Sequence, residues 1–247
     1  MATSEGDRAT DVEAASNSLY RVGGAAALIC AVIYLITLGV YIPANRAGPP
    51  PGTVLEWLTL FQTSPLTALF FLGLADILIM ILWGPMALAL YSALRQANKT
   101  WSIIATAFVF VGMAVYLATN TAFSMLSLSH RYAAAEGDQA AVVAAGQAML
   151  AVSEGTGQYT GMPLVWLAGA ILSAVMLRSK AFGKATAWVG IVGLGLLVAS
   201  IPFAGYTTTG PMTAARSAVV AVTYIGGGLL SLVWYILVGL RLLKLDG

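Results

Sequence analysis

Long uninterrupted runs of apolar residues dominate the chain, and the polar residues are collected between them. A transmembrane helix needs about 20 apolar residues, because the hydrocarbon core is about 30 Å thick and a helix rises about 1.5 Å per residue. Six runs approach or exceed that length, at about residues 22–42, 66–94, 101–128, 161–177, 185–204 and 214–240. They are unbroken rather than alternating, so they predict helices and not the strands of a membrane barrel.

The predicted fold is all-α: a polytopic integral membrane protein with a six-helix transmembrane bundle in one domain, residues 19–244. Residues 1–18 are polar, and we predict that they form a disordered cytoplasmic segment. The first run does not fit a cleaved signal peptide, because it is too long and follows acidic residues such as Glu5 and Asp7.

The composition is that of a membrane protein, and it excludes several kinds of binding site. Hydrophobic residues make up 59% of the chain and charged residues only 9%, whereas a soluble domain has about 25% charged residues. One cysteine (Cys30) and one histidine (His130) exclude a disulfide framework and a Cys/His metal cluster. The net charge of +2 is too small to indicate nucleic-acid binding. We therefore expect no cofactor and no metal.

The basic residues predict the orientation of the bundle. With six spans, one side of the membrane carries nine Lys and Arg residues and the other carries three, namely Arg46, Arg131 and Arg216. Because basic residues concentrate in cytoplasmic loops, both termini are predicted to be cytoplasmic.

Two segments on the predicted outer face have helical patterns of their own. Residues 54–61 place apolar side chains around Glu56, which predicts a short helix in the membrane interface. Residues 138–153 form an alanine-rich stretch that is too short and too polar at its flanks to span. This stretch is either a cap packed on the bundle or one wall of an outward-facing cavity, and the pattern favours the cap.

Asp76 is the one charged residue in the middle of a predicted span, about eleven residues inside the outer end of the second. A carboxyl isolated at that depth is expected to keep its proton. Tyr116, Asn120 and Ser124 share one face of the third span at a matching depth. Asp76 and this face form either a polar clasp between helices, which we favour, or a proton- or ligand-binding site.

The remaining candidates lie toward the outer face. His130 follows the third span and fits an interfacial residue, since no Gly-x-Ser-x-Gly motif accompanies it. Glu56 and Glu154 fit solvated loop acids better than cation ligands, because they lack a regular ligand spacing. Asp76 has no second carboxylate at its depth, so no catalytic residue is assigned.

Two stretches resemble a known family. They are Arg21-Val-Gly-Gly before a span ending at Pro43, and the loop Arg178-Ser-Lys-Ala-Phe-Gly-Lys184 running into Trp188-Val-Gly-Ile-Val-Gly193. The pattern resembles bacterial six-helix membrane proteins known as domain of unknown function 4386, over about residues 20–205. The resemblance implies the topology, and it implies no activity, catalytic residue or cofactor.

We expect a multi-pass protein of the bacterial inner membrane that acts as a binding or accessory protein. The first alternative is a small proton-coupled transporter organised around Asp76 and Asn120. The second is an enzyme that acts on a lipid at the outer face. The expected partners are the bilayer, a lipid or small-molecule ligand, and a second copy of the chain.

The unequal distribution of Lys and Arg residues predicts the topology directly. Reporter fusions after residues 48, 98, 137, 181, 209 and 247 should alternate outside, inside, outside, inside, outside and inside. A reporter that is active outside when fused after residue 247 would contradict the orientation.

Overall fold

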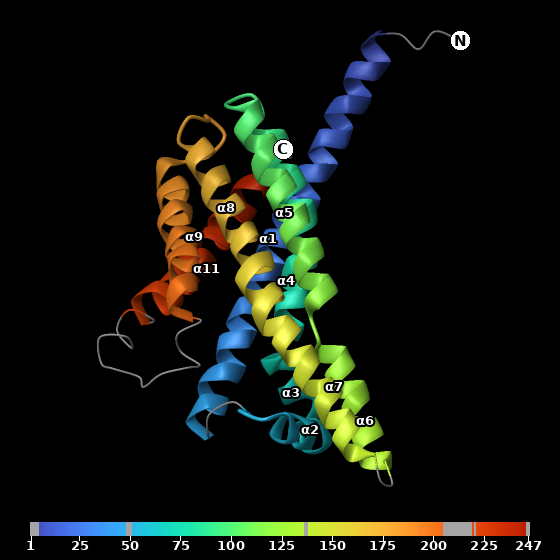
Figure 1. Ribbon diagram of the computed structural model, residues 1–247. Helices are drawn as coiled ribbons and strands as arrows, with labels where there is room; N and C mark the ends of the chain where they lie inside the picture. The colour runs from blue at the N-terminus through green and yellow to red at the C-terminus, as the bar shows by residue number, and fades with distance from the viewer. Residues whose placement is uncertain (1–4, 48–50, 136–137, 205–218, 220, 246–247) are drawn as a thin grey trace.

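The computed structural model describes residues 5–47, 51–135, 138–204, 219 and 221–245, and the elements assigned in them are all helical (Figure 1). They are α1 (Glu5–Ala47), α2 (Val54–Thr63), α3 (Pro65–Phe71), α4 (Leu74–Leu94), α5 (Lys99–Thr119), α6 (Ala122–Ala134), α7 (Gln139–Val152), the π-helix η1 (Ser153–Gly161), α8 (Met162–Met176), α9 (Lys184–Ala204), the π-helix η3 (Ala221–Gly226) and α11 (Gly227–Leu243).

Six helical segments are long and apolar enough to cross a membrane, so the predicted all-α, six-span fold is confirmed. They are Asn17–Val40, Leu74–Leu94, Lys99–Ala134, Tyr159–Met176, Lys184–Ile201 and Val222–Leu243. The start of the predicted sixth span, residues 214–218, lies outside the described residues.

The N-terminal segment differs from its prediction. Helix α1 begins at Glu5, so the described part of residues 1–18 is helical and not disordered. Ala9, Ala14 and Ala15 are strong helix formers, and acidic residues near a helix N-terminus are favoured by the helix dipole. Because the segment extends a helix already formed by the first span, it avoids the cost of nucleation.

The structure also differs from the prediction in the second span, which is divided into two helices. Helix α3 ends at Phe71, and α4 begins at Leu74 after Gly73, whose φ of 90° lies in the left-handed region. The third span is interrupted in the same way, since α5 ends at Thr119 and α6 begins at Ala122. The apolar run is continuous across the first interruption, so hydropathy does not reveal it, whereas the second falls on the polar residues Thr119, Asn120 and Thr121.

The interruptions divide the molecule into two hydrophobic cores. The transmembrane core lies among the spanning helices, and the cap core is formed by buried residues of α2, α3 and α6. In Figure 1, helices α2, α3, α6 and α7 gather at one end of the bundle, which we call the cap end. The α4–α5 loop, the α8–α9 loop and the C-terminal end of α11 lie at the opposite end, which we call the basic end.

Three aromatic residues pack against one another in the transmembrane core. The rings of Trp83 and Trp234 stack with their centroids 5.7 Å apart. The indole nitrogen of Trp83 donates a hydrogen bond of 2.9 Å to the hydroxyl of Tyr235. Such pairs stabilise a core beyond the area they bury, and here they fasten α4 to α11.

Small residues let the helices approach one another closely, as they do in other membrane bundles. Gly23, Ala27 and Ala31 on α1 are buried, as expected of a face that packs within the bundle. Gly112 on α5 lies directly against η1, because a Cβ at that position would be 2.6 Å from the carbonyl oxygen of Gly161. A backbone oxygen cannot move aside as a flexible side chain can, so this crossing requires glycine.

Gly112→Ala is therefore expected to lower the stability of the bundle by about 1–3 kcal/mol through overpacking. The measurement is the thermal unfolding midpoint of the purified protein in detergent. Gly195→Ala is the matched control, because nothing lies within 4 Å of a Cβ at that helical position. Equal midpoints for the two variants would contradict the proposed close crossing.

Candidate functional site

The start of α4 places Asp76 in the first turn of that helix, three residues after Gly73. Helix α4 has 21 residues and is by itself long enough to cross the hydrocarbon core. Asp76 therefore lies near the cap end of a spanning helix and not near its middle. The expected depth of eleven residues was wrong because residues 66–71 belong to the separate helix α3.

The amide of Asn120 connects the two helix interruptions. Its Nδ2 donates to the carbonyl oxygen of Leu72 at 3.1 Å, in the break between α3 and α4. Its Oδ1 accepts from the backbone N–H of Ala122 at 3.0 Å, in the break between α5 and α6. One side chain thus satisfies backbone groups that both interruptions leave without a helical partner.

A chain of hydrogen bonds leads from Asn120 to Asp76. Asn120 Nδ2 lies 3.3 Å from the hydroxyl oxygen of Tyr116, to which it also donates. The side chain of Tyr116 is in turn hydrogen-bonded to Asp76. With the Tyr116 hydroxyl accepting from Asn120 and donating onward, Asp76 is the terminal acceptor of the chain. Its carboxyl has more acceptor positions than this one bond uses.

Gly73 makes room for this arrangement. A Cβ on residue 73 would lie 2.5 Å from the Tyr116 hydroxyl oxygen, 3.2 Å from Asn120 Nδ2 and 3.4 Å from Asp76 Oδ2. Three polar atoms therefore converge on one glycine, which we group with Asp76, Tyr116 and Asn120 as the Asp76 cluster. Gly73 was not among the residues that the sequence singled out. The sequence shows it only as a glycine inside an apolar helical pattern.

A buried polar group near the cluster lacks a partner. Thr121 follows Asn120 in the interruption, its side chain is 7% exposed, and its hydroxyl has no hydrogen bond to the described part of the chain. A buried hydroxyl without a partner is costly. A water or a ligand in the break would remove that cost.

Two tyrosines from other helices lie close enough to interact electrostatically with Asp76. They are Tyr34 on α1 and Tyr235 on α11. The hydroxyl of Tyr34 presses against Gly228 at the start of α11. The surroundings of Asp76 thus include side chains from α1, α5 and α11.

The structure does not bring the remaining candidates to this cluster. Glu56 forms a capping box, in which its Oε2 accepts from the backbone N–H of Gly52 at 2.7 Å and of Thr53 at 3.3 Å. His130 is exposed on α6, and the side chain of Glu154 lies outside the described residues. Among the described residues, no group of three His, Cys, Asp or Glu side chains is placed to hold a metal ion.

Ser124 is not part of the cluster either. The break after Thr119 ends the i, i+4 register that the sequence predicts for Tyr116, Asn120 and Ser124. Ser124 belongs to α6, where it is exposed. The predicted polar face is therefore shortened to Tyr116 and Asn120.

Comparison with known proteins identifies the family. The sequence model described as Domain of unknown function (DUF4386) matches residues 22–243. The chain belongs to this family. The match begins in the first spanning helix and ends in α11, so the Asp76 cluster lies within the DUF4386 domain. No curated protein and no solved structure matched the chain.

The contacts of Asp76 predict how substitutions there change stability. Asp76→Asn should leave the unfolding midpoint nearly unchanged, because an amide oxygen still accepts from Tyr116. Asp76→Leu should lose roughly 1 kcal/mol, the size of a hydrogen bond between membrane helices. Thermal unfolding in detergent measures both. A fully stable Asp76→Leu protein would contradict a structural contribution from this hydrogen bond.

Proposed function

We propose that this DUF4386 protein is a multi-pass protein of the bacterial plasma membrane that binds a small ligand at the Asp76 cluster, with both termini in the cytoplasm. The nine-to-three distribution of basic residues supports this orientation. The N-terminal part of α1 and the C-terminal end of α11 lie toward the basic end of the bundle, as an even number of spans requires (Figure 1).

One observation carries the binding proposal: a carboxyl with unused acceptor positions terminates a hydrogen-bond chain where two helix interruptions meet. An ionisable residue within a spanning helix is costly, and such residues commonly mark ion or substrate sites. The Asp76 side chain is intermediate in exposure, so the surrounding helices do not enclose it completely.

The chemistry of the cluster defines the class of ligand. Asp76 supplies an acceptor and a negative charge when ionised, while Asn120 has both its oxygen and its nitrogen engaged. The groups that complete the site are a proton, a monovalent cation or a small ammonium group. Thr121 offers a hydroxyl to a ligand or water in the same break.

A second candidate is a proton-coupled transporter, and the paired interruptions favour it. Transporter sites are often built from discontinuous membrane helices, whose exposed backbone groups and helix ends meet at the substrate. The breaks at Gly73 and at Asn120 provide two such ends side by side. In this candidate, Asp76 takes up and releases the coupled proton.

A lipid enzyme has less support. Glu56 is engaged in a capping box, and His130 is exposed on α6 with no acid hydrogen-bonded to it in the described part of the chain. General acid–base chemistry needs such groups within hydrogen-bond reach of one reacting atom.

Asp76→Asn tests both candidates, because it preserves the shape of the side chain and removes its charge. Sodium, lithium and methylammonium chloride are each compared with choline chloride at equal ionic strength. At least one of the three should raise the unfolding midpoint of the native protein by about 2–4 °C when it is near five times its dissociation constant. The shift should be absent in Asp76→Asn.

Asp138→Asn is the matched control, since Asp138 is exposed at the start of α7 and makes no capping hydrogen bond. It should keep the full shift. Proton flux in proteoliposomes then separates the candidates, because a flux lost only in Asp76→Asn indicates transport. If neither the midpoint nor the flux depends on Asp76, the cluster is only a clasp between helices and the proposal is wrong.

A further inference from the structure

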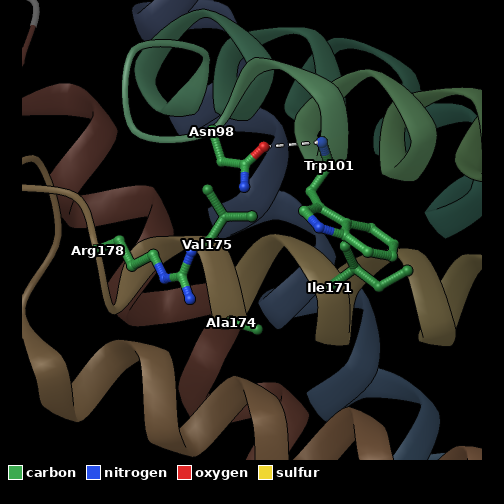
Figure 2. A pocket seen from close by; sticks show the side chains of 6 residues that line it. All are labelled: Asn98, Trp101, Ile171, Ala174, Val175 and Arg178. Carbon is green, nitrogen blue, oxygen red and sulfur yellow. Dashed lines mark hydrogen bonds between the residues drawn. The ribbon is translucent and has the colours of Figure 1, made fainter.

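A groove at the basic end, opposite the cap end where the Asp76 cluster lies, has a different chemistry. It lies between the start of α5 and the end of α8 and has a volume of about 290 Å³. Its lining residues are Asn98, Trp101, Ile171, Ala174, Val175 and Arg178 (Figure 2). This volume is just below the lower limit for small-molecule sites, which is about 300 Å³.

Three polar donors border the groove. The guanidinium of Arg178 has no hydrogen bond or ion pair to the part of the chain that the structure describes. Asn98 caps α5 through its Oδ1, which accepts from the backbone N–H of Trp101 at 3.2 Å. This bond leaves the Nδ2 hydrogens of Asn98 available, and Trp101 adds an indole N–H. Figure 2 shows Asn98 and Arg178 on either side of Val175, with the Trp101 ring beside Ile171.

The electrostatics of this end favour an anion. The two loops that flank the groove, residues 95–99 and 177–184, contain five basic residues and no acidic residue. The N-terminus of the 21-residue helix α5 adds the positive end of a helix dipole. An arginine guanidinium matches the oxygens of a phosphate through paired hydrogen bonds.

The rest of the groove is apolar and belongs to the perimeter of the bundle. Ile171, Ala174 and Val175 line it on α8, and Trp101 is half-exposed. Ile103 on α5 and Leu167 on α8 are exposed apolar residues of the same two helices. In a spanning protein, such exposed apolar side chains face lipid tails. A ligand with a phosphate and an acyl chain matches both parts of the groove.

We propose that the groove between α5 and α8 binds the phosphate headgroup of an anionic membrane phospholipid of the phosphatidylglycerol class. Arg178 and Asn98 donate to the phosphate oxygens, the Trp101 ring lies at the level of the glycerol backbone, and an acyl chain follows Ile171 along α8. Basic pockets between spanning helices on the cytoplasmic side hold anionic headgroups in this way.

The test is the unfolding midpoint of the full-length protein in neutral detergent, with phosphatidylglycerol, phosphatidylcholine or inorganic phosphate added. About 0.5 M salt screens general attraction between charges beyond a few ångströms. Phosphatidylglycerol near five times its dissociation constant should raise the midpoint by about 2–4 °C, and the other two should not. Inorganic phosphate separates a free anion from a lipid headgroup as the source of the phosphate.

Arg178→Gln should remove most of the shift. Asn98→Asp should reduce it as well, because aspartate still caps α5 but brings a negative charge and no donor. The matched control is Lys184→Gln, which removes a positive charge from the same end without touching the groove. Asp76→Asn should keep the full shift, so the outcome does not depend on the proposed function.

Three results would overturn the proposal. They are an equal shift with phosphatidylcholine, an equal shift with inorganic phosphate alone, and an undiminished phosphatidylglycerol shift in both Arg178→Gln and Asn98→Asp. The midpoints of these variants without lipid show whether each is folded, and two independent substitutions keep the test decisive if one fails to fold.

Discussion

A backbone in or beside hydrocarbon must satisfy its own polar groups, and the amide of Asn120 supplies one such partner in each of two helix interruptions. Without water, an unpaired N–H or C=O at membrane depth costs several kcal/mol. The breaks at Gly73 and at Asn120 expose such groups, and the Asn120 side chain donates to one break and accepts from the other. The geometry of α3, α4, α5 and α6 therefore depends on that residue.

The same connection separates the two hydrophobic cores. On the side of the basic end, the transmembrane core is fastened by the stacked rings of Trp83 and Trp234 and by the close contact of Gly112 with Gly161. On the side of the cap end, α2, α3 and α6 enclose the cap core, and the capping box of Glu56 fixes the start of α2. The Asp76 cluster lies at the boundary, where side chains of both cores end.

The two sites lie toward opposite ends of the bundle, and an apolar core that includes Trp83, Trp234 and Tyr235 lies between them. At the cap end, an acceptor carboxyl lies beside helix interruptions. At the basic end, donors of Arg178 and Asn98 border an apolar groove. The two sites have opposite charge, so a proton or cation at one end and an anionic lipid at the other would not compete.

The sequence by itself determined the number and order of the spanning helices, because each must supply a long apolar run whatever its neighbours do. It also singled out Asp76, Tyr116 and Asn120, since polar residues within apolar runs are visible without a structure. It did not reveal that α4 begins at Leu74, because a glycine in an apolar run is compatible with an unbroken helix. The backbone of Gly73 is left-handed, and Tyr116 and Asn120 on another helix leave no room there for a larger side chain. Tertiary structure alone decided the depth of Asp76, the loss of Ser124 from the polar face and the placement of Asn98 and Arg178 at one groove, because each depends on which helix ends meet in space.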